Sequence, residues 1–204
     1  MVRSRRTGGV PRTSTASVLL HWLPLGAGGH SIRWNGRVFE AVVAHHEHRA
    51  ARALYHSALE VRLDADRYVI EMTPAWGGGS TDRGVVREGP VGSRLLGRWA
   101  AFRYEVRRWR NGIIGDVDAA PSGPRLVGDD PVRTRLLLDL VPRFPALTWG
   151  RDELRAGDMW NSNSLTSWLL ALSGNELDDL VPPGSGRAPG WDAGLVAAAR
   201  STRR

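Results

Sequence analysis

The chain has 204 residues and no cysteine, which excludes disulfides, thiolate metal sites and a cysteine nucleophile. Hydrophobic residues make up 42% of the chain and charged residues 24%, as in ordinary globular domains, and no run approaches the roughly 20 apolar residues that span a bilayer. The net charge of +7 arises at the two ends: seven of the 28 basic residues lie there, and the other 21 balance the 21 acids.

This charge distribution sets the expected domain boundaries. We predict a disordered basic tail over residues 1–17, a single domain over residues 18–200 and a short basic tail over residues 201–204. The neutral body argues against nucleic-acid binding, which needs a basic surface. Ser4-Arg5-Arg6 is similar to the start of a twin-arginine export signal, but no apolar core follows directly, so we expect a cytoplasmic protein.

Two β-hairpins are predicted in the first part of the domain. Residues 30–34 and 37–43 alternate apolar with polar side chains around Asn35-Gly36, a dipeptide that favours a type I′ turn. Residues 55–63 and 67–73 form a second pair of strands, joined by a short acidic turn.

A mobile loop is expected from Gly77 to about Gly97, because it opens with three consecutive glycines. Residues 99–109 then alternate aromatic with charged side chains, which predicts another strand, and Asn111-Gly112 ends it. The segment from 77 to 154 as a whole suggests no role.

After this strand the apolar spacing becomes helical. Asp130 can cap a helix whose first residue is Pro131, and Pro142 and Pro145 end it. The apolar stripe of this helix is predicted at Val132, Leu136, Leu137 and Leu140.

Two further helices are predicted, one from about Asn163 to Leu172, which Gly174 stops, and one from Trp191 to Arg200. Strands come first and helices follow. The sequence therefore predicts the α+β class, with an antiparallel sheet packed against a few helices.

No metal or cofactor is predicted. Residues 45–48 contain three histidines and one glutamate, but a strand cannot direct all three imidazoles at one ion, and the His-Glu-X-X-His spacing is absent. A solvated turn is the preferred interpretation. Neither Gly26-Ala27-Gly28-Gly29 nor Gly77-Gly78-Gly79 ends in the Lys-Ser/Thr of a phosphate loop.

The candidate catalytic site lies at the start of the 163–172 helix. A hydroxyl nucleophile at Ser162 would benefit from the positive end of the helix dipole, and nearby amides can form an oxyanion hole. Serine needs a base, and His56, at the start of a predicted strand, is the best-placed histidine. Glu60 shares its face and can orient the ring; Asp152 is the alternative.

A purely structural interpretation competes with this one. Ser and Asn are common helix caps, and Asn161, Ser162 and Asn163 are three candidates for that role. Capping alone does not explain asparagine on both sides of the serine. We predict Asn161 and Asn163 as members of the catalytic group, and Trp160, Trp76 and Tyr55 as substrate-binding residues.

The motif at residues 55–61, with its tyrosine-bearing return strand at residues 67–71, resembles the His motif of circularly permuted papain-like families. Asn161-Ser162-Asn163 is similar to the Asn-Cys-Asn motif of the PPPDE (desumoylating isopeptidase-like) group, with serine in place of the cysteine nucleophile. Lecithin retinol acyltransferase-like proteins share the order of the two motifs.

The resemblance implies a permuted papain-like arrangement and a nucleophile–His pair acting on amide, isopeptide or ester bonds of a peptide, protein or acyl-ester substrate. Serine does not ionise as a thiol does. Two hypotheses therefore stay open: a Ser–His hydrolase or acyltransferase, and a catalytically degenerate domain that acts as a binding module. Oligomeric state is undetermined by the sequence.

Overall fold

The computed structural model describes residues 15–25, 53–75 and 83–203. The strands are β1 (Ala16–Pro24), β2 (Tyr55–Leu63), β3 (Asp66–Pro74), β4 (Val85–Pro90), β5 (Arg103–Arg110) and β6 (Arg125–Gly128). The α-helices are α2 (Pro131–Leu140), α3 (Ser162–Leu172) and α4 (Trp191–Ser201). Short 3-10 turns are η1 (Leu96–Arg98), η2 (Ala100–Phe102), η3 (Val117–Ala119), η4 (Val141–Arg143) and η5 (Pro183–Ser185).

The six strands form one sheet in the order β4-β5-β3-β2-β1-β6, and all of its strand pairs are antiparallel. The predicted α+β class, with an antiparallel sheet packed against helices, is confirmed. None of the helices within the described ranges has the length and apolar content that crossing a bilayer requires.

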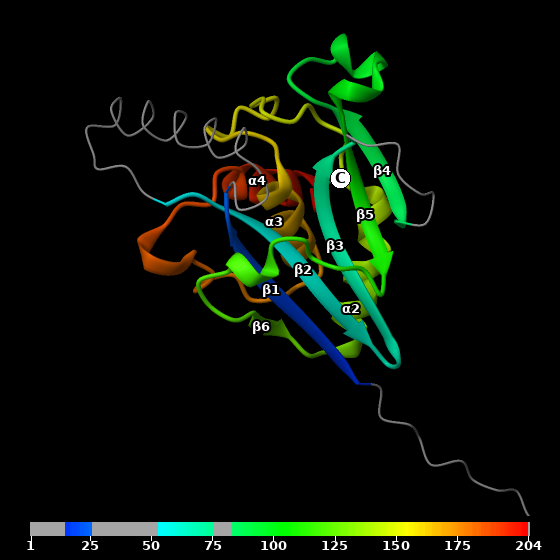
Figure 1. The fold of residues 1–204 in the computed structure, drawn as a ribbon, viewed down its shortest axis with the longest axis vertical. Helices are drawn as coiled ribbons and strands as arrows, with labels where there is room; N and C mark the ends of the chain where they lie inside the picture. The colour runs from blue at the N-terminus through cyan, green and yellow to red at the C-terminus, as the bar shows by residue number, and fades with distance from the viewer. Residues whose placement is uncertain (1–14, 26–52, 76–82, 204) are drawn as a thin grey trace, which may run out of the picture.

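The two faces of the sheet are covered differently (Figure 1). Helices α2 and α3 pack on one face and α4 packs on α3, and the main core lies there. The connection from β5 to β6 crosses the other face, where Ile114 and Ala120 contact Leu23, Ala58 and Val69. We call these the helix face and the open face of the sheet.

The second predicted hairpin is confirmed. β2 pairs with β3 from Leu59↔Ile70 to Leu63↔Asp66, and Asp64 in the turn has a positive φ of 56°. Two observed strands, β1 and β6, were not predicted. A third, β4, lies within the segment that we expected to be a loop, and η2 forms where the strand over residues 99–109 was expected to begin.

The predicted start of α2 and the predicted end of α3 are confirmed. The Asp130 carboxylate accepts hydrogen bonds from the amides of Val132 and Arg133, 2.8 and 2.9 Å away, and Gly174 follows α3 with a φ of 73°. The predicted stripe of α2 is only half right, since Leu137 and Leu140 are buried, whereas Val132 is 75% exposed and Leu136 43%.

Several predictions fall outside the described residues. These are residues 1–14 of the expected basic tail, the hairpin around Asn35-Gly36, the histidine-rich run at residues 45–48, Trp76, and the glycines that open the expected mobile loop. The tail was expected to reach residue 17, but β1 already begins at Ala16, where it pairs with the end of β2.

Candidate functional site

Asn161 is the N-cap of α3. Its Oδ1 accepts a hydrogen bond from the Asn163 amide at 2.9 Å, while the Ser164 hydroxyl accepts one from the Asn161 amide at 3.0 Å, which completes a capping box. The Asn161 Nδ2 donates to the Pro189 carbonyl at 2.7 Å. The polar atoms of this side chain are therefore engaged in holding the helix start against the loop before α4.

Asn163 joins three parts of the fold. Its Nδ2 donates to the carbonyls of Tyr55 at 2.9 Å and Pro189 at 2.8 Å, and its Oδ1 accepts from the Ser57 hydroxyl at 2.8 Å. The residue is 2% exposed. This buried clamp between β2, α3 and the loop before α4 accounts for the second asparagine, which capping alone left unexplained.

Ser162 is the first residue of α3, as predicted, and is buried. Within the described residues its hydroxyl has no hydrogen-bond partner, in contrast to those of Ser57 and Ser164. It is therefore neither a cap nor a link in the buried polar network of its neighbours.

The structure does not bring His56 and Ser162 together. Successive residues of a strand point to opposite faces of a sheet. The side chain that reaches α3 from β2 is Ser57, which is hydrogen-bonded to Asn163 and also to Thr166 at 2.9 Å. His56 lies on the open face, where it lines a cavity with Ala58 and Leu23. His56 does not approach α3 as expected, because its neighbour Ser57 occupies the side of β2 that faces the helix and His56 points to the opposite side.

Neither predicted orienting residue bonds the His56 ring. Glu60 shares the open face, as expected, but its carboxylate pairs with Arg67 at 2.7 Å and Arg62 at 2.9 Å. The Arg67 hydrogen bond, helped by Arg62, lowers the pKa of Glu60. Asp152 accepts hydrogen bonds from two amides of its own loop, at residues 156 and 157.

The predicted substrate-binding aromatics are core residues where they are described. Trp160 is 1% exposed and stacks on Phe144 with ring centroids 4.7 Å apart, and Tyr55 is also buried in the main core. These positions give the predicted binding role no support.

A cavity of about 410 Å³ opens on the open face of the sheet. His56 from β2, Glu71 and Thr73 from β3, and Arg107 from β5 contribute polar side chains to it. Arg83 and Asp116 add charges from outside the strands, and Leu23, Trp109, Ile113 and Ile114 form its apolar walls.

The charged groups of this cavity interact with one another. Arg107 is 9% exposed and pairs with Glu71 at 3.0 Å and with Glu105 at 2.9 Å. Burial raises the pKa of Glu71, with Arg107 opposing the change, and repulsion from Asp116 acts in the same direction as burial. Burial also lowers the pKa of His56, against the attraction of Asp116. The imidazole is therefore uncharged at neutral pH and can accept a proton.

Thr73 adds an unsatisfied polar group. Its hydroxyl is buried and has no hydrogen-bond partner in the part of the chain that the structure describes. A buried hydroxyl without a partner costs about 1–3 kcal/mol, so a ligand that bonds it would recover that cost. Among the same residues, no three His, Asp or Glu side chains lie close enough to hold a metal ion.

Sequence reasoning found His56 but not the other members of this cavity. Glu71, Arg107 and Asp116 lie on two strands and a crossing connection, and no motif links them. The signal available in the sequence was the presence of charged residues at alternating positions of these strands, and the same pattern occurs where such residues face solvent. Perturbed acid and base groups gathered in a cleft are typical of functional sites, although structural ion pairs also perturb pKa values.

Comparison of the chain with protein-family models, with curated proteins and with solved structures returns no match. Its function must therefore be argued from the geometry alone.

Proposed function

We propose that this domain is a binding module and that it holds a small zwitterionic ligand, a free amino acid or a short peptide, in the cavity beside His56. This is the binding hypothesis of the sequence analysis, with its site moved to the open face of the sheet. The observation that carries it is the balanced set of charges around one partly enclosed cavity.

The charge balance argues for a ligand with both signs. Among the lining residues, Arg83 and Arg107 are positive, Glu71 and Asp116 are negative, and His56 is neutral. Arg107 is already paired with Glu71 and with Glu105, which lies outside the lining, so Arg83 and Asp116 are the charges that a ligand would meet. A ligand with a net negative or a net positive charge would leave an unbalanced charge in a partly desolvated cavity, and this costs free energy. An ammonium can pair with Asp116 while a carboxylate pairs with Arg83.

Size and polarity agree with this class. A cavity of about 410 Å³ lies in the lower part of the roughly 300–1,000 Å³ range of small-molecule sites. Its apolar wall at Leu23, Trp109 and Ile114 can contact an aliphatic side chain. The neutral imidazole can accept a hydrogen bond from the ammonium of such a ligand, and the buried, unpartnered Thr73 hydroxyl becomes available when the ligand displaces the atoms that cover it.

Titration calorimetry with two matched probes tests the proposal. Alanyl-alanine should bind in the micromolar to millimolar range, whereas its N-acetylated, C-amidated form, which has neither charge, should bind at least about tenfold more weakly. Equal binding of the two probes, or no heat with the dipeptide or with any free amino acid at 10 mM (roughly tenfold above a millimolar Kd), would contradict the proposal.

Variants locate the site. Thr73→Val, which keeps the shape of the side chain, and Arg83→Gln should each weaken dipeptide binding about tenfold, as the loss of one ligand hydrogen bond predicts. Ser162→Ala should leave binding unchanged, because that residue lies on the helix face. A loss of binding in Ser162→Ala with none in Thr73→Val would place the ligand elsewhere.

The Ser–His hydrolase hypothesis makes the opposite prediction at Ser162. Because the sheet separates His56 from this hydroxyl, we expect no covalent adduct with a fluorophosphonate probe at neutral pH. Labelling that disappears in both Ser162→Ala and His56→Ala would restore the enzymatic hypothesis and reject the binding module.

A further inference from the structure

The connection between β4 and β5 presents a group of large apolar side chains to solvent. Leu95 is 73% exposed, Leu96 44%, Trp99 68% and Phe102 41%. These are four of the eleven large hydrophobic residues that are exposed in the described part of the chain, and they lie within eight residues. We call residues 95–102 the apolar projection; it extends beyond the ends of β4 and β5 in Figure 1.

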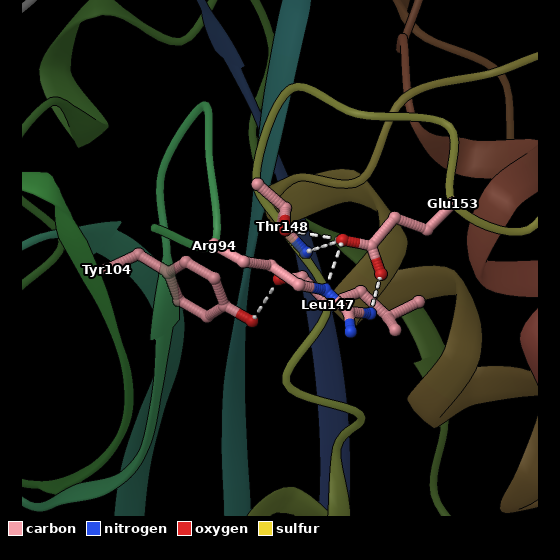
Figure 2. Close-up of polar contacts among 5 residues, drawn as sticks. All are labelled: Arg94, Tyr104, Leu147, Thr148 and Glu153. Atoms are coloured by element: carbon pink, nitrogen blue, oxygen red, sulfur yellow. Dashed lines mark hydrogen bonds and ion pairs between the residues drawn. The ribbon is translucent and has the colours of Figure 1, made fainter. Parts of the chain in front are cut away.

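Both ends of the apolar projection are fixed to the body of the domain (Figure 2). Before it, the Arg94 guanidinium forms a bidentate pair with the Glu153 carboxylate, which also accepts hydrogen bonds from Thr148. After it, the Tyr104 hydroxyl donates to the Leu147 carbonyl at 2.9 Å.

The projection is also ordered internally. Its backbone forms two successive 3-10 turns, η1 and η2, with the Trp99 amide donating to the Leu96 carbonyl at 3.0 Å and the Phe102 amide to the Trp99 carbonyl at 2.9 Å. The apolar side chains are thus held in place without being buried. Most of the conformational entropy that a docking element would lose on binding is therefore already lost in the free protein.

The charges around the projection select the partner. Residues 91–104 contain three arginines and no acidic residue. Arg94 and Arg103 pair with Glu153 and Glu88 at its base, while Arg98 lies exposed among the apolar residues. Tryptophan, leucine and phenylalanine beside arginine match the boundary between lipid headgroups and acyl chains, where rings insert and basic groups contact anionic headgroups.

We propose that the apolar projection docks the domain onto an anionic membrane surface, with Leu95 and Trp99 inserted at the headgroup boundary and Arg98 among the headgroups. The binding is peripheral and does not depend on the ligand proposed for the open face.

Vesicle co-sedimentation of the full chain tests this proposal. Vesicles of phosphatidylcholine with 30 mol% phosphatidylserine should bind the protein, and pure phosphatidylcholine vesicles should bind it about tenfold more weakly. Leu95→Ser with Trp99→Ser should reduce partitioning at least about tenfold, because two large apolar side chains no longer insert. Arg98→Gln should reduce it about fivefold, on anionic vesicles only.

The matched control is Val132→Ser with Leu136→Ser. These two residues are also apolar and exposed, but they lie on α2 and should leave binding unchanged. Because the basic tails can themselves attract anionic lipid, a chain without residues 1–14 is measured alongside. Binding that disappears with that tail but persists in Leu95→Ser/Trp99→Ser would overturn the proposal. An absence of binding at about 1 mM lipid would also overturn it. For comparison, one inserted acyl chain, with a K of roughly 10⁴ M⁻¹, already binds about a tenth of the protein at 10 µM lipid.

Discussion

Replacing Asn163 with alanine distinguishes a structural role of the Asn-Ser-Asn motif from a catalytic one. The substitution removes three hydrogen bonds of a buried side chain, to Ser57, to the Tyr55 carbonyl and to the Pro189 carbonyl. Each such bond contributes a net of about 1 kcal/mol, so Asn163→Ala should lower the free energy of unfolding by about 3 kcal/mol.

Ser162→Ala is the paired measurement. The hydroxyl of Ser162 has no partner among the described residues, and alanine is well tolerated at the first position of a helix. The change in free energy of unfolding should stay within about 0.5 kcal/mol, the range of substitutions that remove no specific interaction. The motif would then be a clamp whose middle residue is dispensable for stability.

Urea unfolding monitored by tryptophan fluorescence measures both variants. With an m-value of roughly 2 kcal/mol/M, a loss of 3 kcal/mol moves the midpoint down by about 1.5 M, which is easily resolved. A second variant, Asn163→Asp, retains the shape but loses both donors, and it should be at least as destabilising as alanine. The clamp argument would be refuted by a midpoint for Asn163→Ala within 0.3 M of the wild type (about 0.6 kcal/mol at that m-value), or by a larger loss in Ser162→Ala.

Three further predictions concern packing and pH. Gly194→Val should destabilise the domain by about 2–3 kcal/mol, because even a Cβ would lie 2.0 Å from the Ser167 hydroxyl oxygen on α3; a thermal melting point equal to that of the wild type would contradict this close approach of α4. Burial lowers the pKa of His56, so the unfolded chain takes up a proton at a higher pH than the folded chain does. The free energy of unfolding therefore falls as pH drops below about 6.5. In urea titrations, His56→Asn should reduce this fall between about pH 7 and 5.5, and an unchanged fall would count against the argument. The Arg94 hydrogen bond lowers the pKa of Glu153 to about 2, so the stability from this pair is present above pH 4.5 and lost as pH falls to about 2; acid titration of Glu153→Gln should show a smaller loss over that window than the wild type.

The parts of the fold that were predictable depend on local chemistry. The cap at Asp130, the positive φ after α3 at Gly174 and the hairpin turn at Asp64 each need only a few neighbouring residues to be recognised. Helix and hairpin ends were accordingly placed within one or two residues of their observed positions. The sequence also placed Ser162 correctly at the start of α3.

The missed strands lacked the signal that sequence reasoning uses. β1 is buried on both faces from Leu20 to Leu23, so apolar and polar residues do not alternate along it. β4 is an edge strand that ends in Gly89-Pro90, two residues that are rare in strands. Gly89 is nevertheless required, because a Cβ there would lie 2.3 Å from the Tyr104 ring of β5.

The membership of the open-face cavity could not be predicted because it depends on the path of the chain after β5. Asp116 reaches His56 only because the connection to β6 returns across the sheet and packs Ile114 on Val69. The register of β3 and β5 places Glu71 opposite Arg107, and neither partner is unusual in its own strand. Tertiary contacts alone turn these ordinary charges into a buried network.

The separation of His56 from Ser162 is fixed by the backbone and not by a side-chain rotamer. β2 is held from its first residue, since the Tyr55 amide donates to the Arg187 carbonyl and β1 pairs with the whole strand. To turn His56 toward α3, the strand would have to shift by one residue, which would also move Leu59 and Val61 out of the core. Losing the burial of these two residues alone costs about 3–6 kcal/mol, and the Ser57 bonds to α3 would be lost as well. A Ser–His pair is therefore out of reach of small local motion, whereas the cavity beside His56 is already formed on the open face.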